Sequence, residues 1–127
     1  MNNKNRKVLI IEDDPFIADV YVLKLESEGY DVDGAPDGVQ GLEMIKKNKY
    51  DIILLDILMP NMDGFKVLEQ IKMIPEISKI PVIILTNLSQ KKDIQKGIDL
   101  GASDYIIKTK FTPTEVLKTI NKVLEEN

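Results

Sequence analysis

The sequence contains no cysteine and no histidine. The absence of cysteine excludes disulfide bonds, thiol chemistry and zinc ribbons. The absence of histidine removes the usual general base of enzymes and the commonest metal ligand of proteins. Any metal ion that this chain holds must therefore be bound by oxygen atoms.

Long apolar runs are absent as well. No run approaches the roughly 20 residues that a membrane-spanning helix needs, and the first seven residues, MNNKNRK, are polar, unlike a secretory signal. A net charge of -4 disfavours direct binding to nucleic acid, because such binding relies on basic side chains that contact phosphates. We expect a cytoplasmic protein that binds neither membranes nor nucleic acid directly.

The length and composition are those of one globular domain. The 127 residues can bury one core but are too few for two ordinary domains. A content of 43% hydrophobic and 30% charged residues is ordinary for such a domain. We find no repeat, low-complexity stretch or linker, so we expect a single domain over residues 1–127.

Short apolar runs alternate with amphipathic segments along the chain. The runs predict strands at residues 7–12, 30–35, 51–56, 81–86 and 104–108. The segments between them predict helices near residues 15–28, 37–48, 64–73, 90–100 and 112–125. Five strand–helix units in succession predict an α/β fold: a doubly wound, flavodoxin-like parallel sheet in the order 2-1-3-4-5, with five helices.

Residues that begin and end helices stand at the expected boundaries. Asp14, Asp37 and Thr112 are candidate N-caps, because their side chains can accept hydrogen bonds from the first free backbone N–H groups. Gly29 and Gly101 lie where two of the helices should end. These positions support the predicted order of elements.

Polar residues follow or end four of the five predicted strands. Glu12 and Asp13 lie at the end of the first strand and Asp56 at the end of the third. Thr86 ends the fourth strand and Lys108 the fifth. In an open parallel sheet, ligands bind beyond the carboxyl ends of the strands where the winding reverses, and the first and third strands are neighbours there. We therefore expect three carboxylates, a hydroxyl and an amine in one crevice.

Each of these residues also has a plainer interpretation. Glu12 and Asp13 could be solvated loop acids, and Asp56 could begin a turn. Thr86 could be an ordinary β-branched strand residue, and Lys108 could lie along the sheet with its amine in water. Five such residues at one sheet edge are improbable as independent accidents, and their convergence favours a functional site.

The predicted crevice suits phosphoryl chemistry. Neighbouring carboxylates raise one another's pKa values unless a cation offsets their repulsion, so a divalent ion is implied. Mg²⁺ prefers oxygen ligands and is commonly held by one or two carboxylates together with a phosphate. A carboxylate can also attack phosphorus to give an acyl phosphate. The acids would thus hold a metal ion so that another carboxylate can be phosphorylated.

Four motifs carry a resemblance to a known family. These are VLIIEDDP, DIILLDILMPNMDG, PVIILT and GASDYIIK. In their order and spacing, the chain resembles the receiver domain of response regulators in two-component signalling, over a core of about residues 7–125. The resemblance implies a signalling switch rather than an enzyme, with no effector domain in this chain. It would be a stand-alone receiver or part of a larger regulator.

The resemblance also implies the roles of the site residues. Asp56 would be the phosphoacceptor, and Glu12 and Asp13 the acidic pair, with Asp13 a direct Mg²⁺ ligand. The backbone carbonyl of Leu58 would be a further ligand. Mg²⁺ is the implied cofactor.

A switch is implied by three further positions. Thr86 and Lys108 would sense the phosphoryl group, and Tyr105 would be the aromatic switch residue. Phosphorylation would draw the Thr86 hydroxyl inward and let Tyr105 rotate toward the core. The surface of the fourth helix, fifth strand and fifth helix would then change.

The implied partners are other proteins. A sensor histidine kinase or a histidine phosphotransfer protein would donate the phosphoryl group, and a downstream protein would read the altered surface. That surface could also support a homodimer. The kinase, its stimulus and the output cannot be read from the chain.

Three departures from the family pattern affect these expectations. Thr109 follows Lys108 where the family has a proline after a cis bond, so we expect a trans bond that places Lys108 differently, or else a visibly strained loop. Asn87 stands where the family has a small residue and should restrict access to the site. Leu58 and Leu88 cannot orient an attacking water, which predicts slow self-hydrolysis of phosphorylated Asp56.

Other functions fit the sequence less well. A haloacid dehalogenase-type phosphatase carries a second acid two residues after its nucleophile, where this chain has Leu58. A flavin mononucleotide carrier would need a phosphate-binding loop where this chain has three acids, and the motif of P-loop nucleotide triphosphatases is absent. A pseudo-receiver that binds proteins without using phosphate stays open, because of Asn87 and Thr109.

Overall fold

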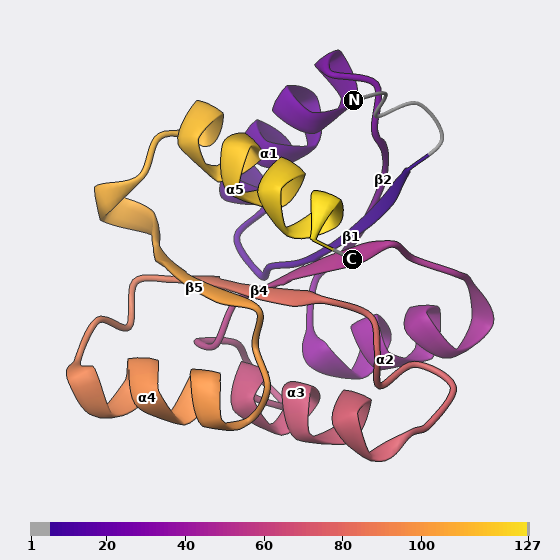
Figure 1. Ribbon diagram of the computed structural model, residues 1–127, viewed down its shortest axis with the longest axis vertical. Coiled ribbons are helices and arrows are strands. Elements are labelled where there is room, and N and C mark those ends of the chain that lie inside the picture. Colours follow the sequence, from indigo (N-terminus) through magenta and orange to yellow (C-terminus); the bar gives the residue numbers. More distant parts are fainter. Residues whose placement is uncertain (1–5, 127) are drawn as a thin grey trace.

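Five apolar segments form the parallel sheet that the sequence predicts (Figure 1). The computed structural model describes residues 6–126. The strands are β1 (Lys7–Ile11), β2 (Asp31–Ala35), β3 (Ile52–Leu55), β4 (Val82–Thr86) and β5 (Asp104–Ile107). Their order in the sheet is β2-β1-β3-β4-β5, with every neighbouring pair parallel. The predicted fold class is confirmed.

Five helices connect and flank the strands. They are α1 (Pro15–Ser27), α2 (Gly38–Lys47), α3 (Gly64–Met73), α4 (Lys91–Asp99) and α5 (Pro113–Glu125). A short 3-10 helix, η1 (Lys108–Lys110), follows β5 and was not predicted. Among the described residues, no helix is long and apolar enough to cross a membrane.

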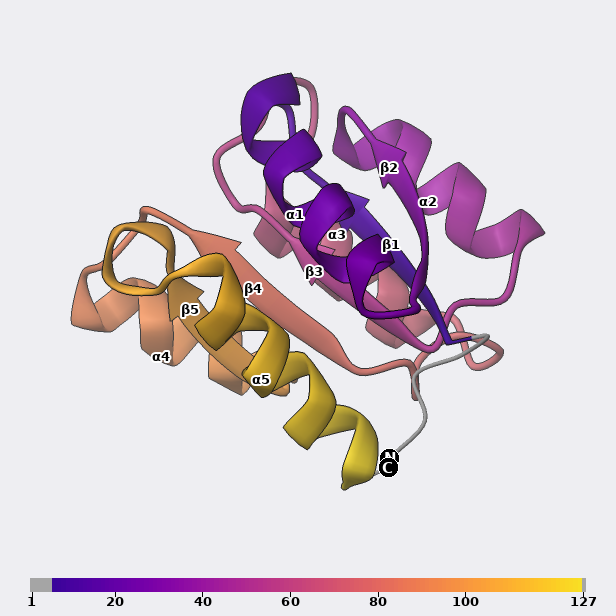
Figure 2. The ribbon, with the colours of Figure 1, turned by 90° about the horizontal axis from the view of Figure 1, so that it is seen from above.

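The helices cover both faces of the sheet. Helices α1 and α5 lie on one face, and α2, α3 and α4 lie on the other (Figures 1 and 2). Alternate side chains of the strands point into separate cores: Val8 and Ile10 pack with α1 and α5, whereas Leu9 and Ile11 belong to the core beneath α2 and α3. Burial on both faces explains why the central strands are apolar without interruption.

Helix boundaries follow the predicted capping residues. The Asp14 side chain accepts hydrogen bonds from the backbone N–H groups of Phe16 and Ile17 at the start of α1. Thr112 and Glu115 form a reciprocal capping box at the start of α5. These local hydrogen bonds determine the residues at which α1 and α5 begin after the preceding strands.

Strand register determines which residues meet at the carboxyl edge. Ile11 of β1 lies opposite Leu55 of β3, so the residues that follow them, Glu12 and Asp56, become neighbours. The Asp56 N–H donates to the Ile11 carbonyl at 3.0 Å, which extends the pairing past the strand end. The predicted site residues therefore arrive at the point where the winding of the sheet reverses.

Gly64 lets α3 begin directly against the end of β3. A Cβ atom there would overlap the Asp56 carbonyl oxygen and lie 2.7 Å from the Cα of Ile57. Both neighbours are backbone atoms, which cannot turn aside as a side chain could. The glycine thus determines how closely the loop after Asp56 folds onto α3.

We predict that Gly64→Ala lowers the free energy of unfolding by about 1 to 3 kcal/mol, the usual cost of overpacking a filled site. Urea unfolding would measure the change. Gly34→Ala is the matched control, because no atom lies within 4 Å of the added Cβ, and it should change stability by less than about 1 kcal/mol. Equal effects of the two substitutions would contradict this account of Gly64.

Candidate functional site

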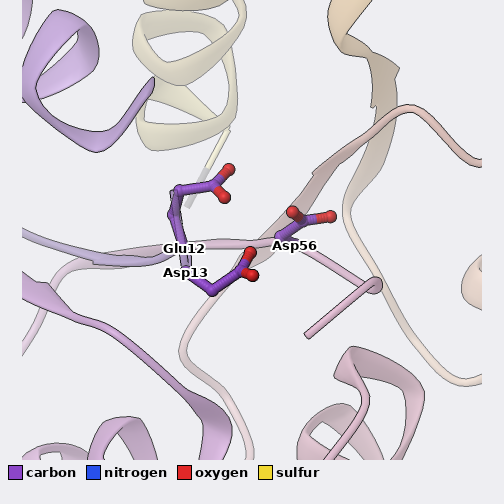
Figure 3. Close-up of side chains that lie close together, drawn as sticks. All are labelled: Glu12, Asp13 and Asp56. Atoms are coloured by element: carbon purple, nitrogen blue, oxygen red, sulfur yellow. The ribbon is translucent and has the colours of Figure 1, made fainter. Parts of the chain in front are cut away.

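Three carboxylates meet at the edge of the sheet between β1 and β3. Glu12 and Asp13 come from the end of β1 and Asp56 from the end of β3, and their side chains point into the same space (Figure 3). One oxygen of each lies within 4.8 Å of the others. Glu12 and Asp56 are buried, whereas Asp13 is exposed. The predicted cluster of acids is present.

Lys108 places its ammonium group between two of these acids. It forms ion pairs with Glu12 and with Asp56, the latter at 2.9 Å between Nζ and Oδ2. The lysine side chain is only 10% exposed. It follows β5, which lies two strands from β3, so its long stem carries the charge across the end of β4.

Backbone N–H groups hold the same two acids in place. Glu12 accepts a hydrogen bond from the Asp14 N–H at 3.0 Å, through the oxygen that does not face Lys108. Asp56 accepts one from the Leu58 N–H at 3.3 Å. Each buried carboxylate is thus fixed by one backbone donor and one ammonium group.

Burial and charge alter the pKa values of the pair in a consistent way. Burial raises the pKa of Glu12 above its usual value, and hydrogen bonds from Lys108 and the Asp14 backbone oppose this only in part. Burial by itself would lower the pKa of Lys108, but its bonds to Glu12 and Asp56 outweigh burial and raise it. The ammonium therefore stays charged at neutral pH.

The donor set fits a hard divalent cation. All three groups are carboxylates, and Asp13 makes no hydrogen bond or ion pair within residues 6–126, so its oxygens are free to coordinate. Three acids face one lysine, which leaves a negative charge in the crevice. Oxygen ligands with excess negative charge suit Mg²⁺.

Thr86 and Tyr105 are both hydrogen-bonded to the loop residue Leu88. The buried Thr86 hydroxyl accepts a hydrogen bond from the Leu88 N–H at 3.4 Å. The Tyr105 hydroxyl donates to the Leu88 carbonyl at 2.6 Å, and burial raises its pKa to about 12. Sequence reasoning named the two polar residues but missed Leu88 as their link, because its contribution is a backbone group that no side-chain motif reveals.

The departures from the family pattern do not keep Lys108 from the acids. All peptide bonds of the described residues are trans, including the bond between Lys108 and Thr109, and neither residue has positive φ. With this trans bond, the lysine contacts both Glu12 and Asp56. Asn87 lines an open groove together with Lys108 and Thr109.

Tyr21 of α1 is a further polar residue beside this site. It is 7% exposed and lines the same groove as Lys108. Sequence reasoning did not single it out, because its spacing from Ile17 and Leu25 is that of an ordinary core-facing helix residue. In the sequence, only its hydroxyl, at a position where an apolar side chain is usual, could have indicated a role at the site.

Together, the sheet order and the acidic crevice define a doubly wound α/β domain with a ligand site where the winding reverses. Residues 8–121 match the family model of the response regulator receiver domain. The chain therefore belongs to the receiver domain family of two-component response regulators, whose members are signalling switches.

Relatives and solved structures agree with this membership. The response regulator ArlR of Staphylococcus saprophyticus is 42% identical over 93% of this chain and 52% of its own length. The DNA-binding dual master transcriptional regulator RpaA of Synechocystis is 39% identical over 93% of this chain and 48% of its own. The chemotaxis protein CheY4 of Vibrio cholerae superposes with a TM-score of 0.88 at 31% identity, covering 94% of this chain and 98% of that one. The chain spans about half the length of the curated relatives it matches.

The raised pKa of Glu12 predicts a pH-dependent stability. Because the folded protein binds this proton more tightly than the unfolded chain does, Glu12 contributes stability below pH 4.5 that is lost as pH rises through the folded pKa. Glutamine does not titrate, so Glu12→Gln should not lose this contribution. The difference in unfolding free energy between the variant and the wild type should therefore shift in favour of the variant as pH rises from about 4.5 to 7. Urea unfolding at several pH values would measure this, and parallel pH profiles would refute it.

Proposed function

We propose that this chain is a phosphorylation-activated switch whose phosphoacceptor is Asp56. The observation that carries the proposal is the buried Asp56 carboxylate, held beside the Lys108 ammonium and two further acids at the sheet edge. A partner histidine kinase or histidine phosphotransfer protein supplies the phosphoryl group. The unit that acts is a single receiver domain over residues 1–127, which works as a switch and not as a turnover enzyme.

The transfer is a displacement at phosphorus. A carboxylate oxygen of Asp56 forms a new bond to phosphorus, while the bond from phosphorus to the imidazole nitrogen of the donor breaks. The electron pair of that bond stays on the donor imidazole, and Asp56 becomes an acyl phosphate. Lys108 and Thr86 then stabilise the phosphoryl oxygens through the ammonium and the hydroxyl.

Glu12, Asp13, Asp56 and the Leu58 carbonyl would hold Mg²⁺. When bound, the ion neutralises negative charge on the phosphoryl group and on the acids. The acids of this chain contribute independently of the ion by orienting Lys108. Its two ion pairs keep the ammonium on the Asp56 side of the crevice.

Signal output runs through the Leu88 backbone. When Thr86 turns its hydroxyl toward a phosphoryl group, its bond to the Leu88 N–H is lost, and the carbonyl that holds Tyr105 is free to move. Rotation of Tyr105 then changes the surface formed by α4, β5 and α5. A downstream protein, or a second copy of the chain, binds the altered surface. Phosphorylation shifts the equilibrium only by its different interaction with the two forms.

Intact-mass analysis tests the phosphoacceptor. After incubation with acetyl phosphate and Mg²⁺, we expect the wild type to gain one phosphoryl group and Asp56→Asn to gain none. Chelation of Mg²⁺ should remove most of the gain, because the crevice is left with uncompensated negative charge. A folded protein that gains no phosphoryl group in any condition would overturn the proposal and support a pseudo-receiver, with Asn87 and Thr109 as the residues to exchange.

Leu58 predicts a long-lived phosphorylated state. It is 54% exposed beside Asp56 and offers no polar atom in its side chain that could orient a water molecule. The phosphorylated protein should survive for much longer than seconds in Mg²⁺ buffer, and Leu58→Gln should shorten its lifetime severalfold. Leu23→Gln is the control, since Leu23 is similarly exposed on α1. Loss of the phosphoryl group from the wild type within seconds would refute slow hydrolysis.

A further inference from the structure

Tyr21 differs from the other tyrosines in one respect. The chain has four tyrosines, all within the described residues. The hydroxyls of Tyr30, Tyr50 and Tyr105 donate to Asn121, Asp33 and the Leu88 carbonyl, respectively. The Tyr21 hydroxyl makes no hydrogen bond within residues 6–126, although the residue is 7% exposed.

The surroundings of Tyr21 belong to the phosphoacceptor site. It lines a narrow hollow with Glu12 and Asp56, and an open groove with Lys108 and Asn87. Burial raises the pKa of Tyr21, and the charges of Lys108 and Glu12 act on the phenol in opposite directions. The hydroxyl is therefore protonated at neutral pH and close enough to both groups to interact with their charges.

Lys108 has a matching unused capacity. An ammonium group carries three protons, and within the described residues Lys108 donates to two acceptors, Glu12 and Asp56. Among residues 6–126, the groove is thus lined by an ammonium group with one proton unpaired and by a hydroxyl that makes no hydrogen bond.

The Tyr21 hydroxyl is open to solvent although the ring is packed. The ring belongs to the apolar core between the sheet and α1, where a phenylalanine would fill the same space. Every buried polar side-chain atom of the described residues has a hydrogen-bond partner, so the Tyr21 hydroxyl, which has none, is not closed off from solvent. Tyr21 lines the open groove beside Lys108, and from that groove a partner can reach the hydroxyl.

We propose that Tyr21 is a positioning residue for Lys108. When a phosphoryl group enters, the ammonium exchanges its bond to Glu12 for one to a phosphoryl oxygen, and the Tyr21 hydroxyl accepts another of its protons, directly or through a water molecule. The ammonium is then held from the α1 side, where Thr109 replaces the proline of the family. The inference rests on the proposed function, because it concerns the same transfer to Asp56.

The test compares the phosphorylation rates of two tyrosine variants, with the stability of each measured alongside. Tyr21→Phe keeps the ring and removes only the hydroxyl, and Tyr50→Phe is the control, a buried tyrosine that lines neither the hollow nor the groove described above. With subsaturating acetyl phosphate and Mg²⁺, we expect Tyr21→Phe to slow phosphorylation about tenfold, the loss of one hydrogen bond to a charged group. Tyr50→Phe should retain the wild-type rate. Urea unfolding would show whether either variant has lost stability.

A double-mutant cycle separates positioning from a general structural effect. If Tyr21 acts through Lys108, Tyr21→Phe should have no further effect on the rate in a Lys108→Met background. An equal fall in both backgrounds would overturn the proposal, as would a wild-type rate in Tyr21→Phe. If the wild type itself gains no phosphoryl group, the proposed function fails. If the wild type is phosphorylated and Tyr21→Phe is phosphorylated at the same rate, the proposed function stands and only the role of Tyr21 is refuted.

Discussion

The ion pairs of Lys108 with Glu12 and Asp56 are the interaction on which the site depends. Parallel pairing of β1 with β3 forces carboxylates together at one edge, and burial makes their repulsion stronger than it would be in water. One ammonium offsets this repulsion only in part, because Asp13 adds a third acid. The Lys108 ion pairs therefore hold Glu12 and Asp56 together, while the remaining negative charge still attracts a further cation.

The rest of the fold holds these charges at fixed positions. The central strands are buried on both faces, and each acid leaves its strand at a place set by the strand register. Gly64 allows α3 to close against the backbone of Asp56. A charged cluster of this kind is tolerable because apolar packing elsewhere leaves the acids little freedom to separate.

The strands, the helix caps and the residues at the strand ends could be predicted from the sequence, because each of them leaves a local pattern in it. The apolar run before Asp56 predicts a buried strand, and the sheet order then predicts its neighbours. The 3-10 helix η1, the hydrogen bonds of Leu88 to Thr86 and Tyr105, and the place of Tyr21 beside Lys108 could not be predicted in this way. They depend on which backbone group or hydroxyl faces which side chain across packed elements, and neither periodicity nor spacing encodes that.

The same ion pairs bear on how the proposed switch would operate. In the unphosphorylated chain, Lys108 is already bonded to Asp56, so a phosphoryl group must compete for an ammonium that is in place and charged. The competition costs little, because the phosphoryl oxygens would carry more negative charge than the carboxylate did. Thr86 has only one bond to exchange, to the Leu88 N–H at 3.4 Å, and that bond is long. The phosphoryl group would therefore draw the hydroxyl away from Leu88 at less cost than it would draw Lys108 away from the acids, so Thr86 would be the easier of the two groups to redirect.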